Sequence, residues 1–199
     1  MHVESPFRIA LILVILLTTV VTAYHRIQAA SSKESISHKE EGYLFAVALR
    51  LAGLSLFVVT LVYLFAPQSV QWAMFPIPRP IRWIGAVTGI LSSVLMFWTL
   101  NSLGKNLTDT VVTRANATLV TNGPYRWVRH PFYVTTALVM FSVTLLTANS
   151  LIGIGSSAVL AMLAIRTPKE EEKLVERFGQ RYLEYISRTN RFLPRVPLK

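Results

Sequence analysis

Apolar residues in this chain form long blocks that short polar segments separate. Three blocks, at about residues 7–25, 43–66 and 81–100, each have the length of one membrane crossing, which takes about 20 apolar residues in a helix. A fourth block, residues 132–165, is too long for one crossing and is interrupted at Ala148-Asn149-Ser150. The pattern therefore predicts an all-α, multi-pass integral membrane bundle of about five transmembrane helices, the last two joined by a tight turn.

The polar segments suggest how the spans are connected. Residues 29–42 are polar and of mixed charge, which is typical of an exposed loop. Residues 67–80 contain four prolines, which predicts an extended connection anchored by Trp72 and Phe75.

The segment after the last span predicts an amphipathic helix. Thr167 suits the N-cap, Pro168 suits the first helical position, and Glu170 completes a capping box. The helix would lie against the membrane interface or over the ends of the spans. Its apolar stripe would consist of Leu174, Phe178, Tyr182 and Tyr185.

Composition supports a single membrane domain over residues 1–199. Hydrophobic residues make up 52% of the chain and charged residues 15%, whereas soluble domains carry about 25% charge. We expect three N-terminal spans in residues 1–100 and a catalytic part in residues 101–199. The chain has no Cys, which excludes disulfides, a thiolate nucleophile and zinc held by sulfur.

The net charge of +10 indicates an interaction with membrane lipid. The cations flank apolar spans and lack the aromatic-interleaved setting of an RNA-binding segment, so we expect no nucleic-acid partner. If the segments that follow the first, third and fifth spans lie on the same side of the membrane, that side holds nearly all the Lys and Arg. The exceptions are Arg8, Arg50, Arg79 and Arg82. The positive-inside rule places that side in the cytoplasm.

Two features near the N-terminus leave alternatives open. Val21-Thr-Ala23 resembles a signal-peptide cleavage site, so the first span could be a signal sequence rather than a retained helix. Arg50 lies inside the second span, where an Arg is a functional candidate. It is near the cytoplasmic end, however, and snorkelling to the interface accounts for it.

Two polar clusters flank the last two spans. The first is the stretch 123–133, with two Arg, one His and two Tyr, and the second is 166–172. Because the last two spans form a hairpin, their cytoplasmic ends are neighbours. His130 and Tyr133 would therefore meet Arg166 and Glu170 at the membrane boundary, where a soluble cofactor and a lipid-anchored substrate can both reach. Taken singly, these residues could also be helix caps, interfacial aromatics or positive-inside anchors.

In combination, the clusters resemble the isoprenylcysteine carboxyl methyltransferase family and the related phospholipid N-methyltransferases. The similarity covers roughly residues 100–197, and its three motifs occur in family order. Arg-His-Pro-x-Tyr alone also resembles membrane-bound sterol reductases. The motifs are Gly-x-Tyr-x-x-x-Arg-His-Pro-x-Tyr (123–133), Arg-x-Pro-x-Glu-Glu (166–171) and Phe-Gly-x-x-Tyr-x-x-Tyr (178–185).

The resemblance implies an enzyme that transfers a methyl group from S-adenosylmethionine to a lipophilic or lipidated acceptor at the cytoplasmic face. The most favoured reaction is carboxyl O-methylation of an isoprenylcysteine-like substrate. Arg166 would face the acceptor as the catalytic residue. This chain departs from the family pattern at Leu107 and Ala117. The cofactor contacts carried over are Ala117, Thr118, Leu119, Val120, Tyr125, His130, Pro131, Phe132, Tyr133, Glu170 and, in addition, Glu171.

Elementary chemistry is compatible with this assignment. A sulfonium methyl donor is cationic and favours aromatic faces and carboxylates as neighbours. The alternatives are phospholipid N-methylation, an NADPH-dependent reductase of the sterol type, or a membrane subunit without activity. We expect no metal site, and the sequence does not determine the oligomeric state.

Overall fold

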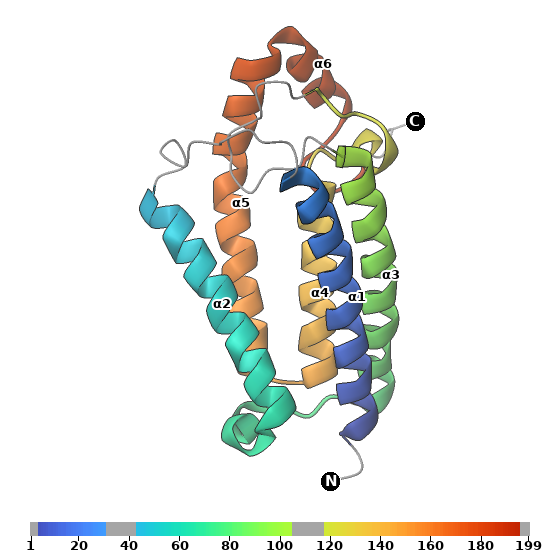
Figure 1. The fold of residues 1–199 in the computed structure, drawn as a ribbon, viewed down its shortest axis with the longest axis vertical. Helices are drawn as coiled ribbons and strands as arrows, with labels where there is room; N and C mark the ends of the chain where they lie inside the picture. Colours follow the sequence, from blue (N-terminus) through green and yellow to red (C-terminus); the bar gives the residue numbers. More distant parts are fainter. Residues whose placement is uncertain (1–3, 31–42, 105–117, 196–199) are drawn as a thin grey trace.

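The computed structural model describes residues 4–30, 43–104 and 118–195, which form a helical bundle (Figure 1). The described helices follow in the order α1 (Ser5–Ala30), α2 (Tyr43–Phe65), η2 (Pro67–Ala73), α3 (Arg79–Leu103), η4 (Gly123–Arg126), α4 (Pro131–Thr147), α5 (Ser150–Phe178) and α6 (Gln180–Arg188). The η elements are short 3₁₀ helices.

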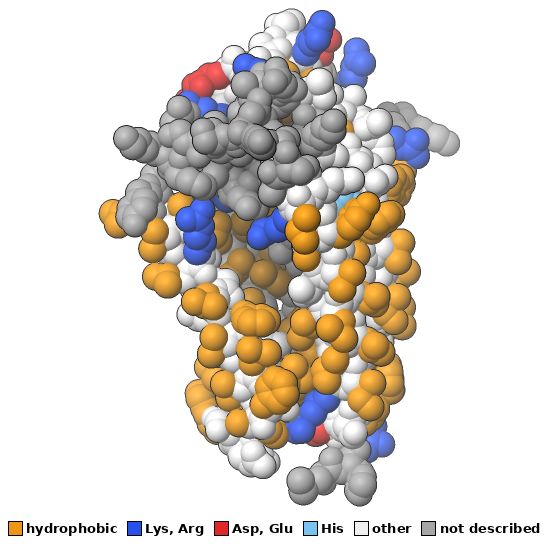
Figure 2. Space-filling view, in the orientation of Figure 1, with side chains coloured by type: hydrophobic (Ala, Val, Ile, Leu, Met, Phe, Trp, Pro, Cys, Tyr) orange, Lys and Arg blue, Asp and Glu red, His pale blue; other side chains and the backbone are white. Residues whose placement is uncertain are grey.

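The predicted membrane bundle is confirmed. Four helices, α1, α2, α3 and α5, are long and apolar enough to cross a bilayer, and α4 is a shorter apolar helix of 17 residues. Hydrophobic side chains cover most of the visible flank, whereas most of the Lys and Arg on this face lie near the end that carries α6 (Figure 2). Because α5 has 29 residues, it is about 43 Å long at 1.5 Å per residue. Its charged second half therefore extends beyond a hydrocarbon layer of about 30 Å.

Small residues let α3 approach α4 closely and so fix the position of α4. Gly85 and Gly89 of α3 face Ser142 of α4, whose hydroxyl donates to the Gly85 carbonyl at 2.6 Å. A Cβ atom at Gly89 would lie 2.4 Å from Ser142 Oγ and 2.5 Å from Val14 Cγ2 of α1. Helices that cannot gain from the hydrophobic effect associate through such close contacts.

A partly buried ion pair joins the helices at the end opposite α6. Arg82 binds both carboxylate oxygens of Glu4, at 2.7 and 2.8 Å, and donates to the carbonyl of Leu146. Tyr63 donates to Glu4 at 3.2 Å. Together with Phe7, Leu11 and Val14 in the hydrophobic core, this cluster packs α1 against the other helices of the bundle.

The predicted break in the last apolar block is confirmed at Ala148-Asn149-Ser150. Ala148 is left-handed, with φ at 48°, and ends α4. Asn149 then caps α5 by accepting from the amides of Leu151 and Ile152, and its side-chain amide donates to the carbonyl of Val70. The hairpin between α4 and α5 is thus fixed at the end remote from the polar clusters.

The predicted extended connection at residues 67–80 is partly wrong. Its first half is the 3₁₀ helix η2, in which Ser69 N–H donates to the carbonyl of Ala66. Pro67 occupies the first turn, where the missing N–H costs nothing and the fixed φ suits a helix.

The predicted helix start at Thr167 is also wrong, because α5 runs without interruption through Pro168 to Phe178. Thr167 does not cap a helix; its hydroxyl donates to the carbonyl of Leu163 at 2.9 Å within α5. Local sequence cannot distinguish a helix start from a helix interior that tolerates proline at a cost of about 3 kcal/mol. Buried contacts of Thr167 and Glu171 on either side of Pro168 keep the helix continuous.

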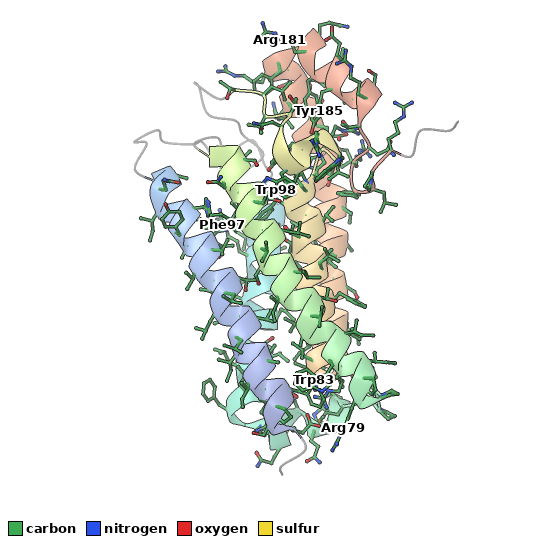
Figure 3. The ribbon with its side chains drawn as sticks, turned by 90° about the vertical axis from the view of Figure 1, so that its right-hand side faces the viewer. Arg79, Trp83, Phe97, Trp98, Arg181 and Tyr185 are labelled. Atoms are coloured by element: carbon green, nitrogen blue, oxygen red, sulfur yellow. The ribbon has the colours of Figure 1, made fainter. Side chains whose placement is uncertain are left out.

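The amphipathic helix is instead α6, which begins after Gly179, where φ is 55°. Its Tyr182 and Tyr185 are buried within the protein, and Tyr185 donates to the carbonyl of Tyr125. The apolar face of α6 therefore covers the η4 turn and the ends of the spans, which was one of the two predicted positions. Figure 3 shows Arg181 and Tyr185 at this end and Arg79 and Trp83 at the other.

Candidate active site

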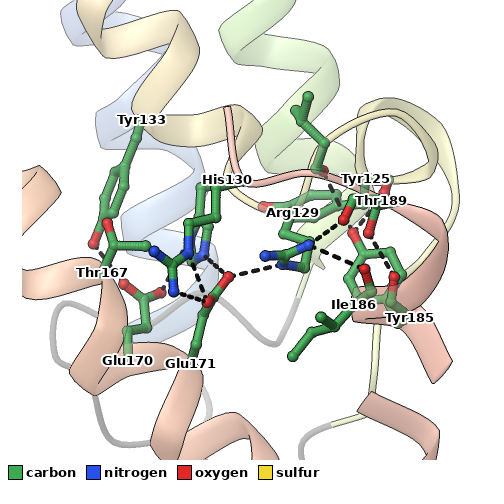
Figure 4. A network of polar contacts seen from close by, with 12 residues as sticks. Tyr125, Arg129, His130, Tyr133, Thr167, Glu170, Glu171, Tyr185, Ile186 and Thr189 are labelled. Atoms are coloured by element: carbon green, nitrogen blue, oxygen red, sulfur yellow. Dashed lines mark hydrogen bonds and ion pairs between the residues drawn. The ribbon is translucent and has the colours of Figure 1, made fainter. Parts of the chain in front are cut away.

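The polar clusters meet at the α6 end of the bundle, where residues 123–133 lie against the second half of α5 and the chain after α6 (Figure 4). Glu170 and Glu171 of α5 are 37 to 42 residues from their partners Tyr133, His130 and Arg129. The predicted juxtaposition of the two clusters is thus found.

Pro131 begins α4 and disfavours a helical conformation at His130, the residue before it. Val128 and Asn190 form a parallel bridge. The amide of Arg129 donates to the carbonyl of Asn190 at 2.9 Å, and the amide of His130 donates to that of Arg191 at 3.0 Å. These bonds point both side chains towards α5.

Glu171 is the centre of a buried ion cluster. Its Oε1 accepts from Nε of Arg129 at 2.7 Å and lies 3.2 Å from Nε2 of His130, while Oε2 accepts from Nε of Arg191 at 2.8 Å. The side chains of Glu171 and Arg129 are 7% and 8% exposed, whereas that of Arg191 is 46% exposed. Both carboxylate oxygens of Glu171 are therefore engaged within the protein.

Glu170 has different surroundings. Its Oε2 accepts from the Tyr133 hydroxyl at 2.6 Å, and its Oε1 lies 4.0 Å from Nδ1 of His130. The rings of His130 and Tyr133 are stacked, with centroids 5.4 Å apart and planes at 12°. Among the described residues, no Arg or Lys lies in ion-pair contact with Glu170. The result is a carboxylate set among aromatic rings.

Tyr125 of η4 completes this aromatic set. It is buried, and burial raises its pKa, an effect that the nearby Glu170 carboxylate increases. Burial likewise raises the pKa of Tyr182 and of Tyr185. These tyrosines therefore stay protonated at neutral pH, with hydroxyl groups that can donate hydrogen bonds.

The other predicted site residues differ in burial and in position. Arg166 is half-buried one turn before Glu170 on α5, so both occupy the same face of the helix. Pro131 is buried, and the Phe132 ring lies 6.1 Å from that of Tyr133. Leu119 and Val120 are half-buried in the chain leading to η4, outside the Glu171 cluster, and Thr118 is exposed. Ala117 and Leu107 lie outside the described residues.

Sequence reasoning missed several residues that build the site. Arg129 belongs to the first motif, but we had counted it only among the positive charges that set the membrane orientation. Arg191 and Thr189 belong to no motif. Arg129 donates to the carbonyls of Ile186 and Thr189 as well as to Glu171. The available signal was the place of Arg129 beside His130 at the entry of a predicted span, where a charged side chain requires a partner.

Comparisons with known proteins agree with the motifs. Residues 84–176 match the model of the isoprenylcysteine carboxyl methyltransferase (ICMT) family. A protein-S-isoprenylcysteine O-methyltransferase of Dictyostelium discoideum is 27% identical over 171 residues, which are 83% of this chain and 65% of that protein. The human protein-S-isoprenylcysteine O-methyltransferase is 31% identical over 137 residues, which are 65% of this chain and 47% of that protein.

The fold is also similar to a solved one. A structure titled as the eukaryotic intramembrane Ras methyltransferase ICMT matches with a TM-score of 0.55 at 24% identity, covering 93% of this chain and 67% of that chain. The resemblance to the ICMT family is therefore confirmed, and the all-helical membrane fold is shared. The chain spans about half to two thirds of the length of the two relatives named above.

Proposed function

We propose that this protein is an S-adenosylmethionine-dependent methyltransferase that acts on a lipophilic acceptor at the cytoplasmic face of a membrane. The observation that carries the proposal is the position of Glu170. Its carboxylate lies beside Tyr133 and near Tyr125, without a Lys or Arg partner in the described chain. Aromatic faces and one unneutralised carboxylate suit a cationic ligand.

The two adjacent glutamates have different proposed roles. Glu170 would accept hydrogen bonds from the donor's ammonium or ribose hydroxyl groups. Glu171 would instead hold Arg129, His130 and Arg191 in place, because both of its oxygens already have partners. Glu171 would thus support the cofactor site through His130 rather than by direct contact, which refines the expectation from the resemblance.

S-adenosylmethionine, held beside Glu170 and the aromatic residues around it, would supply an electrophilic methyl group to the acceptor oxygen, and the electron pair of the methyl–sulfur bond would stay on sulfur. A carboxylate acceptor needs no general base, so the protein contributes alignment and exclusion of water. Arg166 would orient the acceptor carboxylate through two parallel hydrogen bonds, which a guanidinium group can form and an ammonium group cannot. Because Arg166 lies one turn from Glu170, the proposed acceptor and donor sites would share one face of α5.

The acceptor class follows from the family resemblance and from the location of the site. The site lies at one end of the apolar helices α4 and α5, so a ligand with a lipid tail and a polar head could reach it. We favour carboxyl O-methylation of an isoprenylcysteine-like group. The excess of Lys and Arg at this end supports a cytoplasmic orientation.

The direct test is binding of radiolabelled S-adenosylmethionine to the detergent-solubilised protein, compared between wild type, Glu170→Gln and Glu172→Gln. Glu172 is exposed on the same helix and serves as a matched control. We expect saturable binding that Glu170→Gln weakens and Glu172→Gln leaves unchanged. Equal affinity of all three proteins would contradict the role of Glu170, and an absence of binding to the wild type would contradict the function.

A second assay separates the acceptor classes. Methyl transfer to lipids with carboxylate, amine or thiol heads distinguishes carboxyl methylation from phospholipid N-methylation. Consumption of NADPH with a sterol, in place of methyl transfer, would indicate a reductase instead.

A further inference from the structure

The chain that follows α6 folds back across the candidate site. Residues 189–192 run parallel to residues 128–130, joined by hydrogen bonds from the amides of Arg129 and His130 to the carbonyls of Asn190 and Arg191. The Arg129 guanidinium also donates to the carbonyl of Thr189. We call residues 189–192 the strap.

The strap and its partners hold His130 on several sides. The His130 amide is bound to the strap backbone, and Nε2 lies 3.2 Å from Glu171 Oε1. The other oxygen of Glu171 accepts from Arg191 of the strap. One face of the His130 ring stacks on Tyr133, while Phe192 of the strap lies against the ring with centroids 5.9 Å apart at 48°.

The His130 side chain therefore has little freedom to rotate. Its Nδ1 faces Glu170 at 4.0 Å, and Tyr133, on which it stacks, donates to the same carboxylate. If the His130 ring turned away, Tyr133 would lose its stacking partner and Glu170 would lose the imidazole nitrogen that faces it. The orientation of the two residues closest to Glu170 thus depends on contacts that the strap supplies.

We infer that the strap sets the affinity of the site for its methyl donor, with Arg191 and Phe192 as positioning residues that act through His130 and Glu171. The inference rests on the proposed function. The strap is peripheral: Arg191 is 46% exposed in its side chain, and Phe192 is half-buried. The bundle itself is held by the core between α1, α3 and α4, so loss of strap contacts should change donor affinity more than stability.

The experiment compares Phe192→Ala and Arg191→Gln with the wild type in detergent. It measures the dissociation constant for S-adenosylmethionine, KM for the donor, kcat and the thermal midpoint. We expect the dissociation constant and KM to rise on the order of tenfold to a hundredfold, as for displaced positioning groups, with kcat and the thermal midpoint changing little. The conservative variants Phe192→Tyr and Arg191→Lys should restore most of the affinity.

Leu193→Ala is the matched control, because Leu193 is the adjacent residue and is 75% exposed. It should bind the donor as the wild type does. Wild-type affinity in both Phe192→Ala and Arg191→Gln overturns the inference while leaving the proposed function intact. The inference is also overturned if donor binding falls only in proportion to the loss of folded protein and if Phe192→Tyr and Arg191→Lys do not restore it. A wild type that binds no donor overturns the proposed function, and the strap's role with it.

Discussion

Arg129 Nε lies 2.7 Å from Glu171 Oε1, although 42 residues separate the two in the chain. This ion pair joins the segment before α4 to the far half of α5, and both side chains are less than 10% exposed. Together with the contacts of His130 and Tyr133, it joins the two polar clusters at the candidate site.

Removing one member of this pair should destabilise the protein strongly. Glu171→Ala leaves Arg129 buried without its carboxylate partner, and breaking a buried ion pair in this way typically costs about 3–5 kcal/mol. We expect a clear fall of the thermal midpoint in detergent, measured by tryptophan fluorescence. Glu172→Ala, exposed at the next position, is the control. Equal midpoints would show that the pair contributes nothing.

The ion pair at the opposite end predicts a pH dependence. Hydrogen bonds from Arg82 lower the pKa of Glu4. Because the folded-state pKa lies below the ordinary value of about 4.3, the stabilisation is complete above that value. It is lost as the pH falls through the lowered pKa. The difference in thermal midpoint between wild type and Glu4→Gln should therefore be largest near neutral pH and shrink in acid. A difference that is constant with pH would contradict this account.

Close packing of α3 on α4 predicts a steric effect at Gly89. A Cβ there would meet Ser142 Oγ at 2.4 Å and Val14 Cγ2 at 2.5 Å, so Gly89→Ala must push helices apart. We expect a loss of about 1–3 kcal/mol, as for other overpacked cores. Gly53→Ala is a suitable control, since a Cβ at Gly53 meets nothing within 4 Å. Unfolding in a denaturing detergent titration would measure both variants.

Two buried tyrosines of α6 should respond differently to loss of their hydroxyl groups. The Tyr185 hydroxyl donates to the carbonyl of Tyr125, so Tyr185→Phe should cost about 1 kcal/mol. The Tyr182 hydroxyl is buried without a hydrogen-bond partner among the described residues. Tyr182→Phe should therefore leave the thermal midpoint unchanged or raise it. A lower thermal midpoint for Tyr182→Phe than for Tyr185→Phe would show that the Tyr182 hydroxyl, and not the Tyr185 hydroxyl, makes the stabilising hydrogen bond.

The proposed role of Arg166 predicts a separation of binding from turnover. Arg166→Lys keeps the positive charge but cannot form two parallel hydrogen bonds with a carboxylate. We expect donor affinity close to that of the wild type, with methyl transfer to a carboxylate acceptor greatly reduced. Single-turnover assays with saturating donor would measure this. Retained turnover would show that Arg166 makes no two-pronged contact with the acceptor.

Much of the architecture follows from the sequence alone. Spans of apolar residues must be helical in a bilayer because every backbone polar group needs an internal partner. The break at Ala148-Asn149-Ser150 was visible because Asn and Ser favour helix caps. The predicted hairpin also placed His130 and Tyr133 beside Glu170 before their contacts were known, since a hairpin must bring its two open ends together.

Other features were decided by tertiary structure. The Thr167-Pro168-Lys169-Glu170 pattern favours a helix start, yet buried contacts on both sides keep α5 continuous. The sequence could not distinguish Glu170 from Glu171, because their roles depend on which one meets Arg129 and Arg191. The sequence by itself determines the local preference for helix or turn and the length of the apolar runs. Only the packed chain determines which of the two carboxylates is buried among cationic partners, because desolvation depends on neighbours far away in the chain.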